Sequence, residues 1–240
     1  MRSKDKNQTL NHNDKASDLI PDLYEDKYYN PKTMNPEQKD IYDRYFNFNG
    51  GGCIFKRKKE MTEEEYNQAI AAKIKAMNVQ QRALDKLGLD ISQVSEIEPK
   101  EFRNFYYESG VLIKDGTTSK FQVTWLFFSA DQVFVYDLIF DMCNDTEHER
   151  TLEYFYKDIT SIYSKDTVKE ITVHNLSKTG CLKRGLKDKE EKGFIKNSSF
   201  FIIVPGAEGG EKFFCSMPSS THVQDMIFGM KQKIREKKAQ

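Results

Sequence analysis

The chain has 240 residues, of which 37 are lysine or arginine and 37 are aspartate or glutamate, so its formal net charge is zero. Balanced charge excludes a global field that would draw the chain onto nucleic acid or an anionic membrane, and an electrostatic partner would have to meet a local patch. The polar N-terminus lacks the apolar core of a secretory signal and no stretch is long and apolar enough to span a bilayer, so we expect a cytoplasmic protein that is not an integral membrane protein.

The four cysteines are widely spaced and form no CxxC pair: Cys53, Cys143, Cys181 and Cys215. This spacing signals neither a zinc site nor a redox pair, so we expect no metal and no cofactor. Reduced thiols in a cytoplasm are the simplest interpretation.

Residues 1–48 are predicted to form a polar arm that contains one short helix. Asn35 stands at a cap position, Pro36 at the first helical position, and Gln38 where a capping box closes. A helix should therefore begin at this point.

Residues 49–98 are predicted to form a helical segment. Thr62 caps a long helix, Glu65 completes a capping box, and Gly88 ends the helix. Apolar residues at helical spacing form one stripe: Tyr66, Ile70, Ile74, Met77, Leu84 and Leu87. Because most amphipathic helices face their own core, we expect this stripe to pack on the protein's own sheet rather than on a partner.

From Phe102 onward the hydrophobic period changes to two, which is typical of strands. The runs 121–128 and 133–140 are apolar on both faces, so they should form a hairpin through residues 129–131 that is central in the sheet or covered on two sides. The remaining predicted strands are 102–107, 151–156, 160–163, 168–174, 198–204 and 211–216.

The order of these elements predicts an α+β fold. Few helix-length segments separate the strands, so the sheet should be antiparallel. Residues 221–240 carry a last amphipathic helix, with apolar positions at Val223, Met226, Ile227, Met230 and Ile234. We predict that this helix closes a β domain over residues 99–240.

The stretch YFYKDITSI, residues 154–162, ends an aromatic strand, turns a corner and begins another strand. Together with the later strands and the closing helix it resembles pleckstrin-homology-like and GRAM-like domains of bacterial proteins, over about residues 100–236. The resemblance implies an antiparallel β-sandwich or partly open barrel that binds or scaffolds. In pleckstrin-like domains basic residues near the first hairpin commonly meet lipid headgroups, which singles out Lys114 and Lys120 here, although the matching pattern lacks a following arginine.

A basic insertion lies at residues 178–192. Its glycines are spaced as in a phosphate-binding loop, but Leu186 stands where that loop requires lysine. A solvated loop is the default interpretation of such a charge run. The alternative is weak anionic-lipid binding through Lys183, Arg184 and Lys187.

An enzyme with a Cys/His site between the long helix and the sheet is the alternative from a different class. The available imidazoles are His12, His148, His174 and His222. Residues 141–150 gather carboxylates, a thiol and an imidazole, yet they match no zinc or calcium template, and a long polar hairpin turn explains them as well. Within that stretch Cys143 is too exposed in a turn to favour as a nucleophile, and Cys215 is expected to be a small core residue.

The leading hypothesis is a non-enzymatic binding or scaffolding protein whose partner is another protein. Nucleic acid is not expected, because the aromatic residues alternate mainly with apolar or acidic neighbours instead of basic ones. A third class, a regulatory arm, follows from three tyrosines in an acidic context: Tyr24, Tyr28 and Tyr29.

Overall fold

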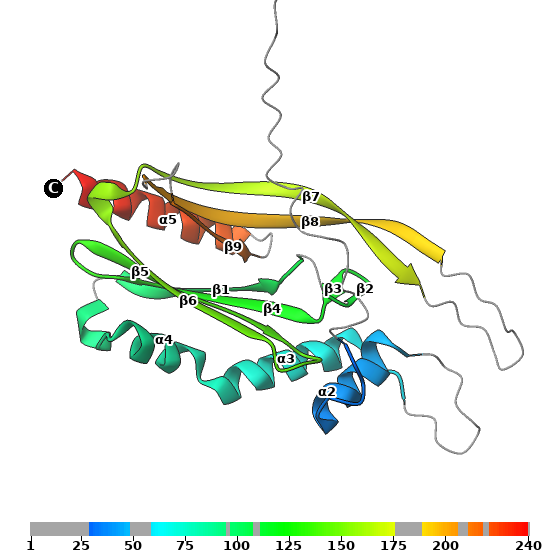
Figure 1. The fold of residues 1–240 in the computed structure, drawn as a ribbon. Helices are drawn as coiled ribbons and strands as arrows, with labels where there is room; N and C mark the ends of the chain where they lie inside the picture. Colours follow the sequence, from blue (N-terminus) through cyan, green and yellow to red (C-terminus); the bar gives the residue numbers. More distant parts are fainter. Residues whose placement is uncertain are drawn as a thin grey trace, which may run out of the picture.

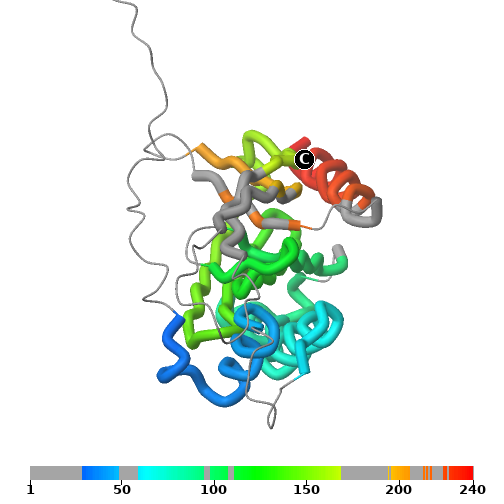
Figure 2. The backbone as a smooth tube through the Cα atoms, turned by 90° about the vertical axis from the view of Figure 1, so that its right-hand side faces the viewer, coloured from blue at the N-terminus to red at the C-terminus, as the bar shows by residue number. Residues whose placement is uncertain are grey.

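The computed structural model describes residues 29–48, 59–94, 97–107, 111–175, 189–205, 211–217 and 221–239. Figure 1 shows the layers: N-terminal helices, a four-stranded sheet, and a three-stranded sheet with the C-terminal helix beside it. Figure 2, turned by 90°, shows the same stack, with the blue and cyan helices at the bottom and the red helix at the top. The predicted α+β class with antiparallel sheets, an N-terminal helical segment and a C-terminal helix is confirmed, and the sheets do not close into a barrel.

Helix α2, Pro36–Ile41, begins where the capping box predicts. The Asn35 side chain accepts a hydrogen bond from the backbone N–H of Gln38, and the Gln38 side chain accepts one from the N–H of Asn35, each at 2.9 Å. Both otherwise unpaired amides are thus satisfied locally. The helix continues into a π-helical turn, η1, Tyr42–Phe46, and its inner side places Ile41 and Tyr45 in the core.

The long predicted helix is two helices, α3, Glu63–Met77, and α4, Val79–Leu87. The predicted start is confirmed by the reciprocal bonds of Thr62 and Glu65, and Gly88 ends α4 in the left-handed region with φ 64°. The prediction of a single helix was wrong, because Asn78 adopts φ 46° and interrupts the helix. Asparagine tolerates this left-handed conformation better than most residues.

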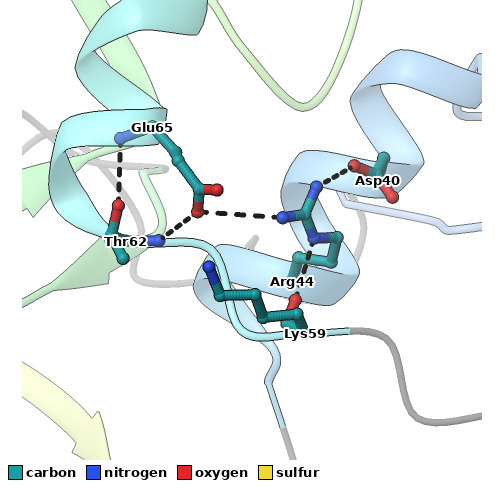
Figure 3. Close-up of polar contacts among 5 residues, drawn as sticks. All are labelled: Asp40, Arg44, Lys59, Thr62 and Glu65. Atoms are coloured by element: carbon teal, nitrogen blue, oxygen red, sulfur yellow. Dashed lines mark hydrogen bonds and ion pairs between the residues drawn. The ribbon is translucent and has the colours of Figure 1, made fainter.

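Arg44 ties the first helical segment to the start of α3, as Figure 3 shows. Its guanidinium donates to the Asp40 carboxylate and to the Lys59 carbonyl, both at 2.9 Å, and lies 3.8 Å from the Glu65 carboxylate. One side chain therefore joins segments 29–48 and 59–94.

The first sheet has the order β1-β4-β5-β6, all antiparallel. Its strands are β1, Ile97–Phe105; β4, Lys120–Phe128; β5, Gln132–Asp141; and β6, Glu147–Phe155. The predicted hairpin is confirmed: the Ser129 N–H donates to the Gln132 carbonyl at 3.0 Å, and β4 and β5 are the central strands. A short 3₁₀ turn, η2, Ile91–Val94, precedes β1.

A small hairpin between β1 and β4 pairs β2, Ile113–Lys114, with β3, Thr117–Thr118. Its turn residues Asp115 and Gly116 have φ 48° and φ 86°. Positive φ at both central positions matches the twist of a two-residue hairpin, and Asp-Gly is a favoured sequence for it.

The second sheet has the order β7-β8-β9, with β7, Ser161–Asn175; β8, Lys189–Val204; and β9, Glu211–Met217. The predicted corner is the 3₁₀ turn η3, Tyr156–Asp158. Two strand predictions were wrong in extent. Residues 164–167 do not interrupt β7, and residues 189–192 of the basic insertion belong to β8, because the two strands pair in one register over their whole length.

Two apolar cores hold the layers together. In the first, α3 and α4 cover the sheet face that carries Val123, Phe127 and Leu138, so the helix stripe packs on the protein's own sheet as predicted. In the second, the inner faces of both sheets meet, and α5, Thr221–Lys238, contributes Ile227, Met230 and Ile234. The β4–β5 hairpin is therefore covered on two sides.

Candidate binding surface

Lys114, predicted as an anion contact, lies beside a cavity of about 400 Å³ at the start of α3. Its ammonium pairs with the Glu60 carboxylate at 2.9 Å and lies 4.7 Å from the centre of the Tyr45 ring. Two lysines and three acidic residues line the cavity. This lining does not favour an anion, and the Lys114 ammonium already has a carboxylate partner.

Lys120 begins β4, opposite Asp141 in register. Burial raises the pKa of the Asp141 carboxyl, and the charge of Lys120 acts in the opposite direction. Lys114 and Lys120 thus lie near different acidic residues, Glu60 and Asp141. The other predicted contacts, Lys183, Arg184 and Lys187, lie outside the described residues.

Two of the four thiols are described, and both are buried. Burial raises the pKa of Cys143 and of Cys215, so both remain protonated at neutral pH. A nucleophilic cysteine needs the reverse shift. The expectation that Cys143 is exposed in a turn was wrong, because it packs in the core between the helices and the first sheet. Cys215 lies in the core between the sheets, as predicted.

The remaining parts of the Cys/His hypothesis are only partly within the described structure. Cys53, Cys181 and His12 lie outside it. His148 is exposed on β6, and for His174 and His222 only the backbone positions, in β7 and α5, are described.

Tyr29 begins the described chain and is buried under the end of the first sheet. Its hydroxyl lies 2.5 Å from the Asp141 carboxylate, to which it donates, and 2.7 Å from the Ser119 hydroxyl. The Cys143 backbone N–H donates to the other carboxylate oxygen at 2.8 Å, and Lys73 donates to the Asp141 carbonyl at 2.7 Å. Asp141 is therefore buried, and it holds Tyr29, the first residue that the structure describes, against the first sheet.

The stretch 141–150 divides into a short turn and a strand. The hairpin turn predicted over residues 141–150 was too long, because residues 147–150 belong to β6. Asp145 accepts a hydrogen bond from the Gln38 side chain at 2.6 Å. Within the described ranges, no group of three or more histidine, cysteine, aspartate or glutamate side chains could hold a metal ion.

An acidic residue that the sequence analysis missed, Asp137, lies in the middle of β5 between the sheets. It accepts hydrogen bonds from Gln122 at 2.8 Å, Thr124 at 2.7 Å and Arg150 at 3.1 Å. The Arg150 guanidinium in turn lies 5.3 Å from the centre of the Phe213 ring on β9. Each of these contacts joins one strand to another, so the role of Asp137 is structural. The only sign of it in the sequence was a single acidic residue within the apolar run 133–140.

The outer half of the second sheet forms a two-stranded ribbon, residues 167–175 of β7 with 189–197 of β8. Strand β9 pairs with β8 only over Ser198–Val204, and within the described structure no further strand pairs with residues 189–197. Asn197 still contacts the first sheet, because its side-chain oxygen accepts a hydrogen bond from the Asn104 side-chain amide at 3.2 Å. From this contact toward Lys189, the paired strands β7 and β8 extend past the edge of the first sheet (Figure 1).

The ribbon exposes two large apolar side chains, Phe194 at 71% and Val168 at 68%. Val168 pairs with Lys196, and Lys196 is two residues from Phe194, so all three lie on one face. Phe200, completely buried in the core between the sheets, lies on the same side of β8. The exposed face is therefore the continuation of the core face, beyond the sheet that covers it.

Comparison with known proteins found no matching family model, curated protein or solved structure. In the described part of the chain, no helix has the length and apolar character needed to cross a membrane.

Proposed function

We propose that this chain is a non-enzymatic cytoplasmic binding or scaffolding protein, and that its pleckstrin-homology-like domain binds another protein through the ribbon. The resemblance to pleckstrin-homology-like domains rests on the order of the elements. These are a first sheet, a corner at residues 156–158, a second sheet and a closing helix. This order supports the assignment of the domain class.

The observation that carries the proposal is the uncovered apolar pair Val168 and Phe194. Large apolar side chains gathered on one face outside the core favour protein contact over solvation. By contrast, both described thiols are buried, and Asp137 and Asp141 are held by hydrogen bonds inside the fold. These thiols and carboxylates thus contribute to the framework, which favours a binding role over a reaction.

Affinity purification from an extract of cells that make the protein tests this proposal. Phe194→Ser removes the larger apolar group of the ribbon, and Phe228→Ser is the matched control, since Phe228 is 68% exposed but lies on α5. At least one protein should be enriched by the wild type and by Phe228→Ser, and reduced tenfold or more with Phe194→Ser. Identical enrichment by all three baits would contradict the proposal.

A further inference from the structure

One edge of β8 has no neighbouring strand along the ribbon in the described structure. Strand β9 pairs with β8 only over Ser198–Val204, so its line ends at Met217, opposite Ser198. In an antiparallel sheet, alternate residues of a strand direct their N–H and C=O groups toward one neighbour or toward the other. Residues 190–196 therefore present a row of backbone donors and acceptors on the side away from β7. Such a free edge is a template for a strand of another chain.

The sequence of this edge contains no backbone obstacle to pairing. Residues 189–197, KEEKGFIKN, include no proline, which natural edge strands use to prevent the addition of a strand. Lysines also protect edges, and whether they do so here depends on the residues that they face across the pair. Two copies of one edge that are related by a two-fold axis run antiparallel, so a second β8 would continue the line of β9 in the same direction.

Self-pairing of this edge about a two-fold axis at Gly193 sets unlike charges opposite each other. In that register residue 190, a glutamate, lies opposite Lys196 of the other copy, and symmetry forms this pair twice. Opposite charges directly across an antiparallel pair stabilise it. Moving the axis by one residue sets like charges opposite each other, Lys192 with Lys196 or Lys192 with its own copy. Charge therefore favours the register about Gly193 and a second copy of the chain as the occupant.

Lys196 can meet a carboxylate across the axis although it already has one beside it. Its ammonium lies 3.6 Å from the Asp166 carboxylate of the same chain, and both side chains are more than half exposed. An ammonium has three donors, and an exposed ion pair of this kind is weak. The Asp166 contact therefore leaves donors of Lys196 for a second copy.

The same register gathers the exposed apolar side chains of the ribbon. Phe194 follows Gly193, so the two copies of Phe194 become diagonal neighbours across the axis, about 7–8 Å apart and within reach of aromatic rings. Val168 lies on the same face as Phe194, and both are largely exposed in the single chain. Pairing would place both copies of these two residues on one face of a wider sheet.

We infer that two copies of this chain pair through the free edge of β8, antiparallel and about a two-fold axis at Gly193, over residues 190–196. The two ribbons then form one sheet with the order β7-β8-β8-β7. The paired length of about 23 Å is short for a permanent dimer, so association should depend on protein concentration. This contact uses the edge of the ribbon, whereas the proposed partner contacts its face. The inference therefore goes beyond the proposed function and does not depend on it.

Sedimentation equilibrium of the full chain tests the pairing, because charge reversal can both break and restore it. With rising concentration, the wild type should shift from the mass of one 28.0 kDa chain toward that of two. Lys196→Glu and Glu190→Lys each set like charges across the axis, so each variant alone should associate at least about tenfold more weakly. An equimolar mixture of the two variants should dimerise about as tightly as the wild type, since unlike charges face each other again.

Two further variants serve as controls. Lys165→Glu is the matched charge reversal, since Lys165 is exposed on β7 and pairs with Ser199, outside the paired length. Val168→Ser changes the ribbon face, because Val168 lies on β7 and not on the edge of β8. Both variants should dimerise as the wild type does.

Three outcomes overturn the proposal: a wild type that stays monomeric at about 0.5 mM, a mixture that stays monomeric, or a dimer that is lost with Val168→Ser. The last would place the contact between copies on the ribbon face. The purification experiment fails independently. A protein lost only from the Phe194→Ser bait, together with a monomeric wild type, keeps the proposed function and removes the pairing. A dimer restored in the mixture, without any such protein, keeps the pairing and removes the proposed partner.

Discussion

The two halves of β8 show how one strand can have different roles along its length. Phe200 and Phe194 lie six residues apart on the same side of β8, yet Phe200 is fully buried and Phe194 is 71% exposed. What differs is the first sheet, which ends beneath the position of Asn197. We call the two sheets without the ribbon, together with the helices that pack on them, the body. The body and the ribbon therefore share the backbone hydrogen bonds between β7 and β8, but the ribbon has no part in the core. This comparison indicates that β8 stabilises the fold at one end and presents a surface at the other.

Replacing each phenylalanine by alanine gives the most direct test of this contrast. Phe200→Ala removes a ring stacked 5.9 Å from Phe102 and leaves a cavity between the sheets. Its free energy of unfolding should fall by about 3–5 kcal/mol. Phe194→Ala should change it by less than about 0.5 kcal/mol. Denaturant unfolding of both variants measures the difference, and equal losses would show that the ribbon belongs to the cooperative core.

Glu149 tests how firmly the body holds its helix layer. It accepts from Arg82 at 2.8 Å and from the Tyr136 hydroxyl, and it pairs with Lys86 at 2.9 Å. Burial raises the pKa of Glu149, but the hydrogen bonds from Arg82, Tyr136 and Lys86 outweigh burial and lower it to about 2.

A depressed pKa means that the stability contributed by Glu149 is complete above the unfolded value of 4.5 and is lost as the pH falls toward 2. Solvent screening reduces this contribution to about 1–2 kcal/mol. Glu149→Gln should therefore be less stable than the wild type at pH 7, and the two should converge near pH 2. Urea unfolding at several pH values measures this, and a constant difference would exclude the ionised carboxylate as the cause.

Tyr29→Phe tests the joint between the N-terminal residues and the body. The variant removes the hydroxyl that donates to Asp141, while the Cys143 N–H still donates to that carboxylate. Loss of one buried, charge-assisted hydrogen bond should lower the free energy of unfolding by about 1–2 kcal/mol. Tyr163→Phe is the control, since its ring stacks on Phe201 in the second sheet. A similar loss in both variants would place the effect outside the Asp141 contact.

The parts of the fold that could be predicted from the sequence are those encoded locally. The capping box of Asn35 and Gln38 set the start of α2, and alternating apolar residues on β4 and β5 gave the central hairpin, because caps and strand faces depend on near neighbours. The break at Asn78 could not be predicted, since asparagine only permits the left-handed conformation and does not require it.

The candidate surface depends on distant residues and was therefore missed. Residues 164–167 are polar and suggest a break, yet a continuous ladder with β8 keeps them in a strand. Phe194 stood between the basic insertion, residues 178–192, and the predicted strand 198–204, so no element was predicted for it, and its exposure depends on where the first sheet ends. The partnership of Asp137 with Arg150 likewise required the register of β5 and β6.

The smallest expected effect would show whether the body and the ribbon open independently. Gly229 lies within α5, and a Cβ added there meets no atom within 4 Å. Gly229→Ala should raise the free energy of unfolding by about 0.5–1 kcal/mol, because alanine restricts the unfolded chain and favours the helix. If residues 189–197 open by local fraying, their amide exchange should stay unchanged while amides of the sandwich core slow down. Slower exchange in both regions would mean that the ribbon opens only when the whole protein unfolds, and the distinction between the two halves of β8 would then be one of exposure alone.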